Sequence, residues 1–64
     1  MHYRQALRIK PHLAEAHNNL GNVSVVQGKP EEAIAHYRQA LEIKPELAEA
    51  HINLGVVLVV HGLT

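Results

Sequence analysis

Six histidines are the side chains best suited to chemistry in this 64-residue chain, because imidazole can carry a proton or bind a metal ion. A zinc site needs three or four converging ligands, yet the sequence has no Cys, no Asp and no pair of histidines four residues apart. We therefore predict no metal and no cofactor, and expect packing roles, with His17 and His51 close enough to approach each other. The six are His2, His12, His17, His36, His51 and His61.

Catalysis has little support in the residue types. The sequence has no Gly-rich phosphate loop, and Ser24 has no evident partner arrangement of a histidine and a carboxylate. Ser24 is therefore expected to be a small residue on a helix face. We predict that the chain has no catalytic residues and is not an enzyme.

The chain repeats itself with a period of 34 residues. Of the thirty residue pairs that this offset aligns, 21 are identical, and the hexamer HYRQAL occurs at His2–Leu7 and again at His36–Leu41. A fixed period of this length indicates an array of helical repeats.

Each period predicts two helices. Apolar residues three or four apart indicate an amphipathic helix that begins near Pro30 and stops at Lys44, because a residue before proline is pushed out of the helical region. An upstream helix is expected over about 13–27, ended by Gly28 as a left-handed cap. The two form an antiparallel hairpin.

Small side chains should let these two helices approach closely. Gly21 is expected to face Ala33, with Leu20, Tyr37 and Leu41 interdigitating around them. A glycine inside a helix costs about 1 kcal/mol relative to alanine, so Gly21 is expected to have a packing reason.

These positions resemble the tetratricopeptide repeat family, whose pattern places Leu-Gly in a first helix, Gly at the turn, then Ala, an aromatic, Ala and a closing Pro. The resemblance implies an all-α fold of antiparallel helical hairpins in a solenoid, with four helices in the order second-type, first-type, second-type, first-type. The single unit 1–64 would divide into a partial repeat 1–11, a complete repeat 12–45 and a partial repeat 46–64. The matching residues are Leu20, Gly21, Gly28, Ala33, Tyr37, Ala40 and Pro45, then Leu54, Gly55 and Gly62.

The resemblance further implies a scaffold that binds a protein or an extended peptide on its concave face, which the first-type helices line. Asn19 and Asn53 occupy the same place in successive copies, and a carboxamide can both donate to and accept from a peptide group. Glu15 and Glu49 on this surface argue against a carboxylate-tail ligand. The implied peptide-binding residues are Asn18, Asn19, Asn22, Val26, Ile52, Asn53 and Val56.

A structural self-assembly unit is the alternative. The run VVLVV is apolar all round, which is typical of a buried helix, and the two terminal helices would each lack the partner helix of a longer array. A homodimer, head-to-tail stacking and a fragment of a longer array all remain open. The expected self-association residues are Tyr3, Leu7, Val56, Val57, Leu58, Val59 and Val60.

Composition narrows the partners. Six basic residues balance six acidic ones and are interleaved with them, which argues against nucleic acid and anionic membranes. The longest apolar run is far below the roughly 20 residues of a membrane span, and the first residues resemble no targeting signal. We therefore expect a cytoplasmic protein whose partners are proteins, peptides or further copies of itself, in a homo-oligomer.

Overall fold

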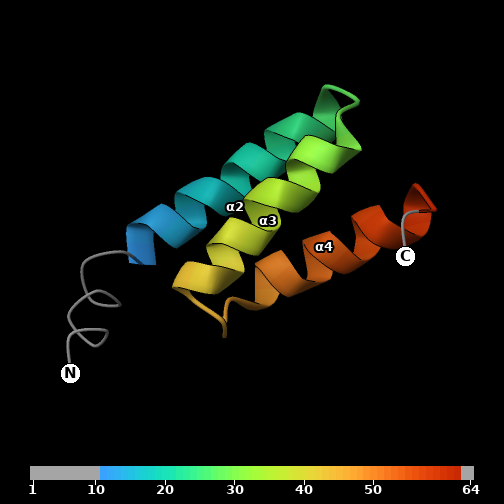
Figure 1. Cartoon of the computed structure of the whole chain (residues 1–64). Helices are drawn as coiled ribbons and strands as arrows, with labels where there is room; N and C mark the ends of the chain where they lie inside the picture. The colour runs from blue at the N-terminus through green and yellow to red at the C-terminus, as the bar shows by residue number, and fades with distance from the viewer. Residues whose placement is uncertain (1–10, 63–64) are drawn as a thin grey trace.

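The computed structural model describes residues 11–62, which form three helices (Figure 1). They are α2 (Pro11–Val26), α3 (Pro30–Ile43) and α4 (Ala48–Val60), and no strand occurs within residues 11–62. The all-α prediction holds for this part of the chain. The helix expected over residues 1–11 lies almost wholly outside the described residues.

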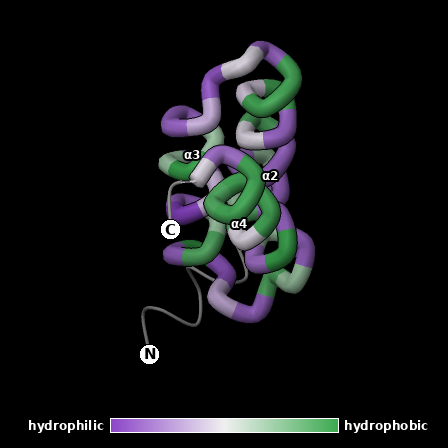
Figure 2. The backbone as a smooth tube through the Cα atoms, turned by 90° about the vertical axis from the view of Figure 1, so that its right-hand side faces the viewer, coloured by the Kyte–Doolittle hydropathy of each residue, from purple (hydrophilic) through white to green (hydrophobic). Residues whose placement is uncertain are grey.

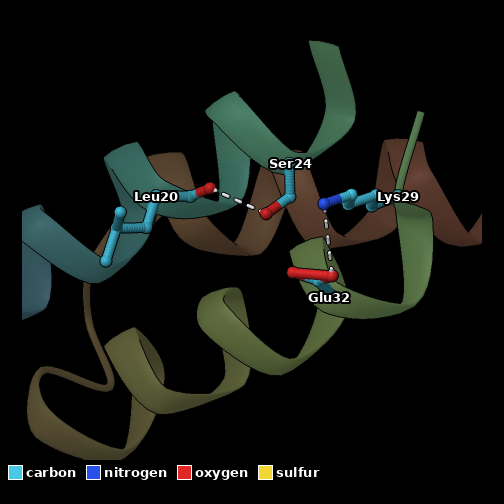
Figure 3. Close-up of polar contacts among 4 residues, drawn as sticks. All are labelled: Leu20, Ser24, Lys29 and Glu32. Atoms are coloured by element: carbon cyan, nitrogen blue, oxygen red, sulfur yellow. Dashed lines mark hydrogen bonds and ion pairs between the residues drawn. The ribbon is translucent and has the colours of Figure 1, made fainter. Parts of the chain in front are cut away.

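The α2–α3 turn follows the predicted signals. Gly28 adopts a φ of 75°, the left-handed conformation expected of a helix cap, and the Lys29 amide donates to the Ser24 carbonyl over 2.8 Å. Pro30 then opens α3, where its missing N–H costs no helical hydrogen bond. Across this turn Lys29 Nζ lies 3.9 Å from Glu32 Oε2 (Figure 3), and both side chains are exposed.

The link between α3 and α4 is also determined by neighbouring residues in the sequence. Helix α3 ends at Ile43, and the Lys44 amide caps it by donating to the Ala40 carbonyl over 2.8 Å. Pro45 then prevents continuation of the helix. After α4, Gly62 adopts a φ of 66°, repeating the conformation of Gly28 one period earlier.

Helix α3 runs antiparallel to α2 and contacts both α2 and α4 (Figure 1). The core lies where the three helices meet, at Ala33, Tyr37 and Val57, with Val25 and Leu54 among the half-buried residues packed against it. Among the described residues Tyr37 is the only large side chain that is fully buried. The other buried apolar residues are four alanines and Val57, so the stability of this small fold depends heavily on one ring.

Gly21 does have a packing reason, although its neighbour is Tyr37. A Cβ placed on Gly21 would lie 2.7 Å from Tyr37 Cδ1 and 2.9 Å from Tyr37 Cζ, closer than real Cβ contacts allow. Leu20, which was expected to interdigitate beside Gly21, is 47% exposed. The absence of a side chain at position 21 therefore makes room for the central core residue.

Helix α4 keeps a large apolar surface. Figure 2 shows hydrophobic residues along much of α4, and Ile52, Val56, Val59 and Val60 are all exposed. No helix in residues 11–62 is both long and apolar enough to cross a membrane.

Candidate functional site

A groove of about 280 Å³ lies between α2 and α4. Helices α2 and α4 supply its walls, and α3 contributes one side chain, Tyr37. Most of the surface is apolar, with polar atoms from two asparagines and one tyrosine. The lining residues are Asn22, Val25, Val26, Tyr37, Asn53, Val56 and Val57.

A network of side-chain hydrogen bonds joins the three helices at this groove. Tyr37 Oη donates to Asn22 Oδ1 over 2.6 Å. Asn53 Nδ2 donates to the same oxygen over 3.2 Å and to Asn18 Oδ1 over 3.1 Å. These bonds fix the orientation of the Asn22 and Asn53 carboxamides, because each has a partner on another helix.

Two polar atoms of the groove-lining asparagines make no bond within this network. Among the described residues, Asn22 Nδ2 and Asn53 Oδ1 have no hydrogen-bond partner, and Asn22 is exposed while Asn53 is half buried. A peptide group presents a carbonyl and an N–H, the complements of these two atoms. The pair can therefore bind a main chain whatever its side chains.

Tyr37 supports this arrangement in its neutral form. Burial raises the pKa of the Tyr37 phenol above its ordinary value, because the phenolate would lose its hydration. The protonated hydroxyl is also the form that donates to Asn22 Oδ1. At neutral pH the tyrosine is thus a fixed donor beneath the groove.

The structure brings together only some of the residues expected to bind a peptide. Asn22, Asn53, Val26 and Val56 line the groove. Asn19 is exposed without lining the groove, and Ile52 is exposed on another face of α4.

Asn18 has a different position from the one expected of a ligand contact. It is only 3% exposed, and its oxygen accepts the hydrogen bond from Asn53. Asn18 is therefore bound to another asparagine of the same chain, Asn53, and helps to fix the orientation of the Asn53 carboxamide.

The predicted peptide-binding set omitted three lining residues, Val25, Tyr37 and Val57. Tyr37 was assigned to helix packing alone, and its bond to Asn22 spans fifteen residues between two helices. No local pattern in the sequence marks such a contact. Val57 lines the groove and also belongs to the core.

The expected self-association surface is also divided. Val56, Val59 and Val60 are exposed and Leu58 is half buried, but Val57 is 3% exposed and packs against Ala33 and Tyr37 of its own chain. Val57 therefore has to be removed from the surface that a second chain could touch. Tyr3 and Leu7 lie outside the described residues.

The histidines pair differently from the expectation. His17 stacks on His36 of α3, with ring centroids 5.9 Å apart, while His51 Nε2 lies 2.7 Å from the Pro45 carbonyl. His17 and His51 occupy equivalent places in successive repeats, whereas His36 faces His17 across the hairpin. In residues 11–62 no three His, Cys, Asp or Glu side chains gather as metal ligands do.

Ser24 is a packing residue on α2. It is buried, and its hydroxyl donates to the Leu20 carbonyl of the same helix over 3.1 Å (Figure 3). A serine in a helix commonly bonds back to the preceding turn in this way. The hydroxyl proton of Ser24 is thus used in a bond to the backbone of its own helix.

Comparison with known proteins supports the repeat assignment. A family model described as a TPR repeat matches residues 25–62, which include all of α3 and α4. Searches of curated proteins and of solved structures find no match to the chain. The matched segment is more than half of the chain, and the protein belongs to the tetratricopeptide repeat family, whose repeats generally mediate protein–protein interaction.

Proposed function

We propose that this chain is a protein-interaction scaffold that holds an extended peptide segment in the groove between α2 and α4. The observation that carries the proposal is the pair of unpartnered atoms, Asn22 Nδ2 and Asn53 Oδ1, above an apolar floor. The floor provides area for apolar side chains, and the two carboxamides bind the peptide main chain.

The side chains around the groove have different roles in this proposal. Asn18 and Tyr37 position the two carboxamides and do not touch the peptide. Asn19, one turn before Asn22 on an exposed face, extends the polar row along α2. Val26 is 86% exposed at the open end, and covering it with a peptide side chain would remove apolar surface from water.

The charge of the groove favours a neutral or basic segment over an acidic tail. Glu15 and Glu49 are both exposed on the helices that form the groove, and no Lys or Arg of residues 11–62 lines it. The proposal assigns the chain no catalytic, metal or cofactor chemistry, and no nucleic-acid partner.

The test uses a library of short random peptides, from which binders to the full chain are selected and measured by calorimetry. Asn53→Ala should weaken binding by about tenfold, the equivalent of one net hydrogen bond, and Gln39→Ala on the exposed face of α3 should not change it. N-methylation of single peptide amides should reproduce the loss at one position. If the selected peptides bind equally well after Asn53→Ala and after backbone methylation, the binding site lies elsewhere on the chain.

A second candidate function is self-assembly, and the exposed face of α4 favours it. Val59 and Val60 are 71% and 69% exposed, and with Ile52 and Val56 they border a hollow of about 460 Å³. A contiguous apolar face of this kind is typical of an interaction surface. Light scattering across a concentration series tests it, since a mass of one chain at every concentration excludes the homo-oligomer.

A further inference from the structure

We infer that the face of α4 around Gly55 binds the N-terminal HYRQAL segment of a second copy of this chain, with Tyr3 of that copy packed on Gly55. The inference deepens the self-assembly candidate by naming its contact. It does not depend on the peptide groove.

The α2–α3 hairpin provides the template for this contact. One face of α2 is covered by α3, and along that face Ala14, Gly21 and Ser24 are buried and His17 is half buried. Two side chains of α3 make its most specific contacts: Tyr37 packs on Gly21, and His36 stacks on His17. Both come from the segment His36–Leu41.

The same face exists on α4 but nothing described covers it. The residues 34 positions after His17 and Gly21 are His51 and Gly55, which are both exposed. A Cβ on Gly55 would meet nothing within 4 Å among the described residues, in contrast to the crowding at Gly21. The hollow of about 460 Å³ is lined by His51, Ile52, Gly55, Val56, Val59 and Val60.

The sequence contains one further segment that could fill this hollow as α3 fills its counterpart. His2–Leu7 has the same six residues as His36–Leu41, and Tyr37 itself is already buried in its own chain. In the repeat register, His2–Leu7 is a second copy of the part of α3 that covers α2, so it offers Gly55 the same tyrosine that Gly21 receives from Tyr37. His2 would then stack on His51 as His36 stacks on His17.

Charge is compatible with this pairing. The first ten residues carry Arg4, Arg8 and Lys10 and no acidic residue, whereas Glu46 and Glu49 mark the start of α4. A contact between different surfaces of identical chains is heterologous, and it propagates as a ladder unless the rotation closes a ring.

The test uses Gly55→Ala and Tyr3→Ala in the full chain. The alanine Cβ at position 55 lies in open space in the isolated chain, so helix content should be kept, but it would clash with a tyrosine ring docked as at Gly21. Each variant should raise the dissociation constant of self-association by about tenfold or more, as loss of a buried aromatic anchor does. Gln39→Ala, on the exposed face of α3, should leave self-association unchanged.

Mixing the two variants gives the sharpest outcome. A Tyr3→Ala chain retains the Gly55 hollow and a Gly55→Ala chain retains Tyr3, so an equal mixture should form a complex of two chains and nothing larger. If the wild-type chain associates while both variants associate equally well, assembly uses another face and the inference is overturned. A wild-type chain that stays monomeric overturns both the inference and the self-assembly candidate, while peptide binding through Asn53 would stand.

Discussion

The ring of Tyr37 occupies the space that a side chain at position 21 would need. Two atoms of that ring, Cδ1 and Cζ, lie 2.7 and 2.9 Å from where a Gly21 Cβ would be, and the tyrosine is buried in the core. The same ring carries the hydroxyl that donates to Asn22 at the groove. One residue therefore joins the packing of the hairpin to the geometry of the candidate binding site.

Gly21→Ala is expected to destabilise the chain despite alanine's better helix propensity. The propensity gain is about 1 kcal/mol, but displacing the buried Tyr37 ring should cost more, giving a net loss of roughly 1–2 kcal/mol in the free energy of unfolding. Urea denaturation at a concentration where the chain is monomeric measures it. The matched control is Gly55→Ala, where the Cβ meets no described atom and the change should raise stability by up to about 1 kcal/mol. Equal effects at the two glycines would contradict the packing described for Tyr37.

Stability should fall at alkaline pH because of Tyr37. Burial raises the pKa of its phenol above the value of about 10 for the unfolded chain, so the folded state retains the proton more strongly. The stabilisation that comes from this raised pKa is fully present below about pH 10 and is lost as the pH rises through the pKa of Tyr37 in the folded state. The phenolate absorbance of a Tyr3→Phe variant, which leaves only Tyr37, follows the titration directly.

The same variant unfolded in urea is the reference for that titration. Its midpoint should lie below that of the folded protein, and Tyr37→Phe should remove the alkaline loss of stability. Coincident midpoints for the folded and unfolded variant would mean that the phenol is not desolvated as the structure indicates.

The helix bounds were predictable because their causes are local. Pro30 can begin a helix, Gly28 can adopt a positive φ and Lys44 precedes a proline, so each boundary is determined by one or two neighbouring residues. The 34-residue period supplied the hairpin. Both kinds of information are present in the chain without any knowledge of distances between helices.

The contacts between helices were predicted less well, because they depend on the crossing geometry. Gly21 was expected opposite Ala33, and the atoms that a Cβ at position 21 would meet first belong to Tyr37. His17 was expected near its repeat counterpart His51, whereas its neighbour across the hairpin is His36. The bonds from Asn53 to Asn18 and Asn22 likewise depend on how closely α4 lies to α2, which no local pattern in the sequence specifies.

Replacing the stacked histidines with phenylalanine should stabilise the hairpin. The Nδ1 atoms of His17 and His36 are buried and have no hydrogen-bond partner in the part of the chain that the structure describes, so each ring carries a desolvated polar atom without compensation. The double variant His17→Phe, His36→Phe keeps two stacked rings and removes both atoms, which should raise the free energy of unfolding by about 1 kcal/mol or more. Thermal unfolding measures the effect.

The control is His12→Phe, at an exposed position of α2, which should change stability little. A double variant no more stable than this control would indicate that the two nitrogen atoms are solvated.

Two valines two positions apart on α4 should differ in how much their truncation destabilises the chain. Val57 packs against Ala33 and Tyr37 and is 3% exposed, so Val57→Ala should lower the free energy of unfolding by roughly 1–3 kcal/mol through lost burial and a small cavity. Val59 is exposed, so Val59→Ala should leave the stability of the monomer within about 0.5 kcal/mol of wild type.

Denaturation at low protein concentration measures both changes, and light scattering at high concentration adds the second readout. Val59→Ala should weaken self-association while folding is retained, which Val57 cannot test because its loss acts on the core of the same chain. A monomer destabilised equally by both substitutions would show that α4 buries a different face from the one described.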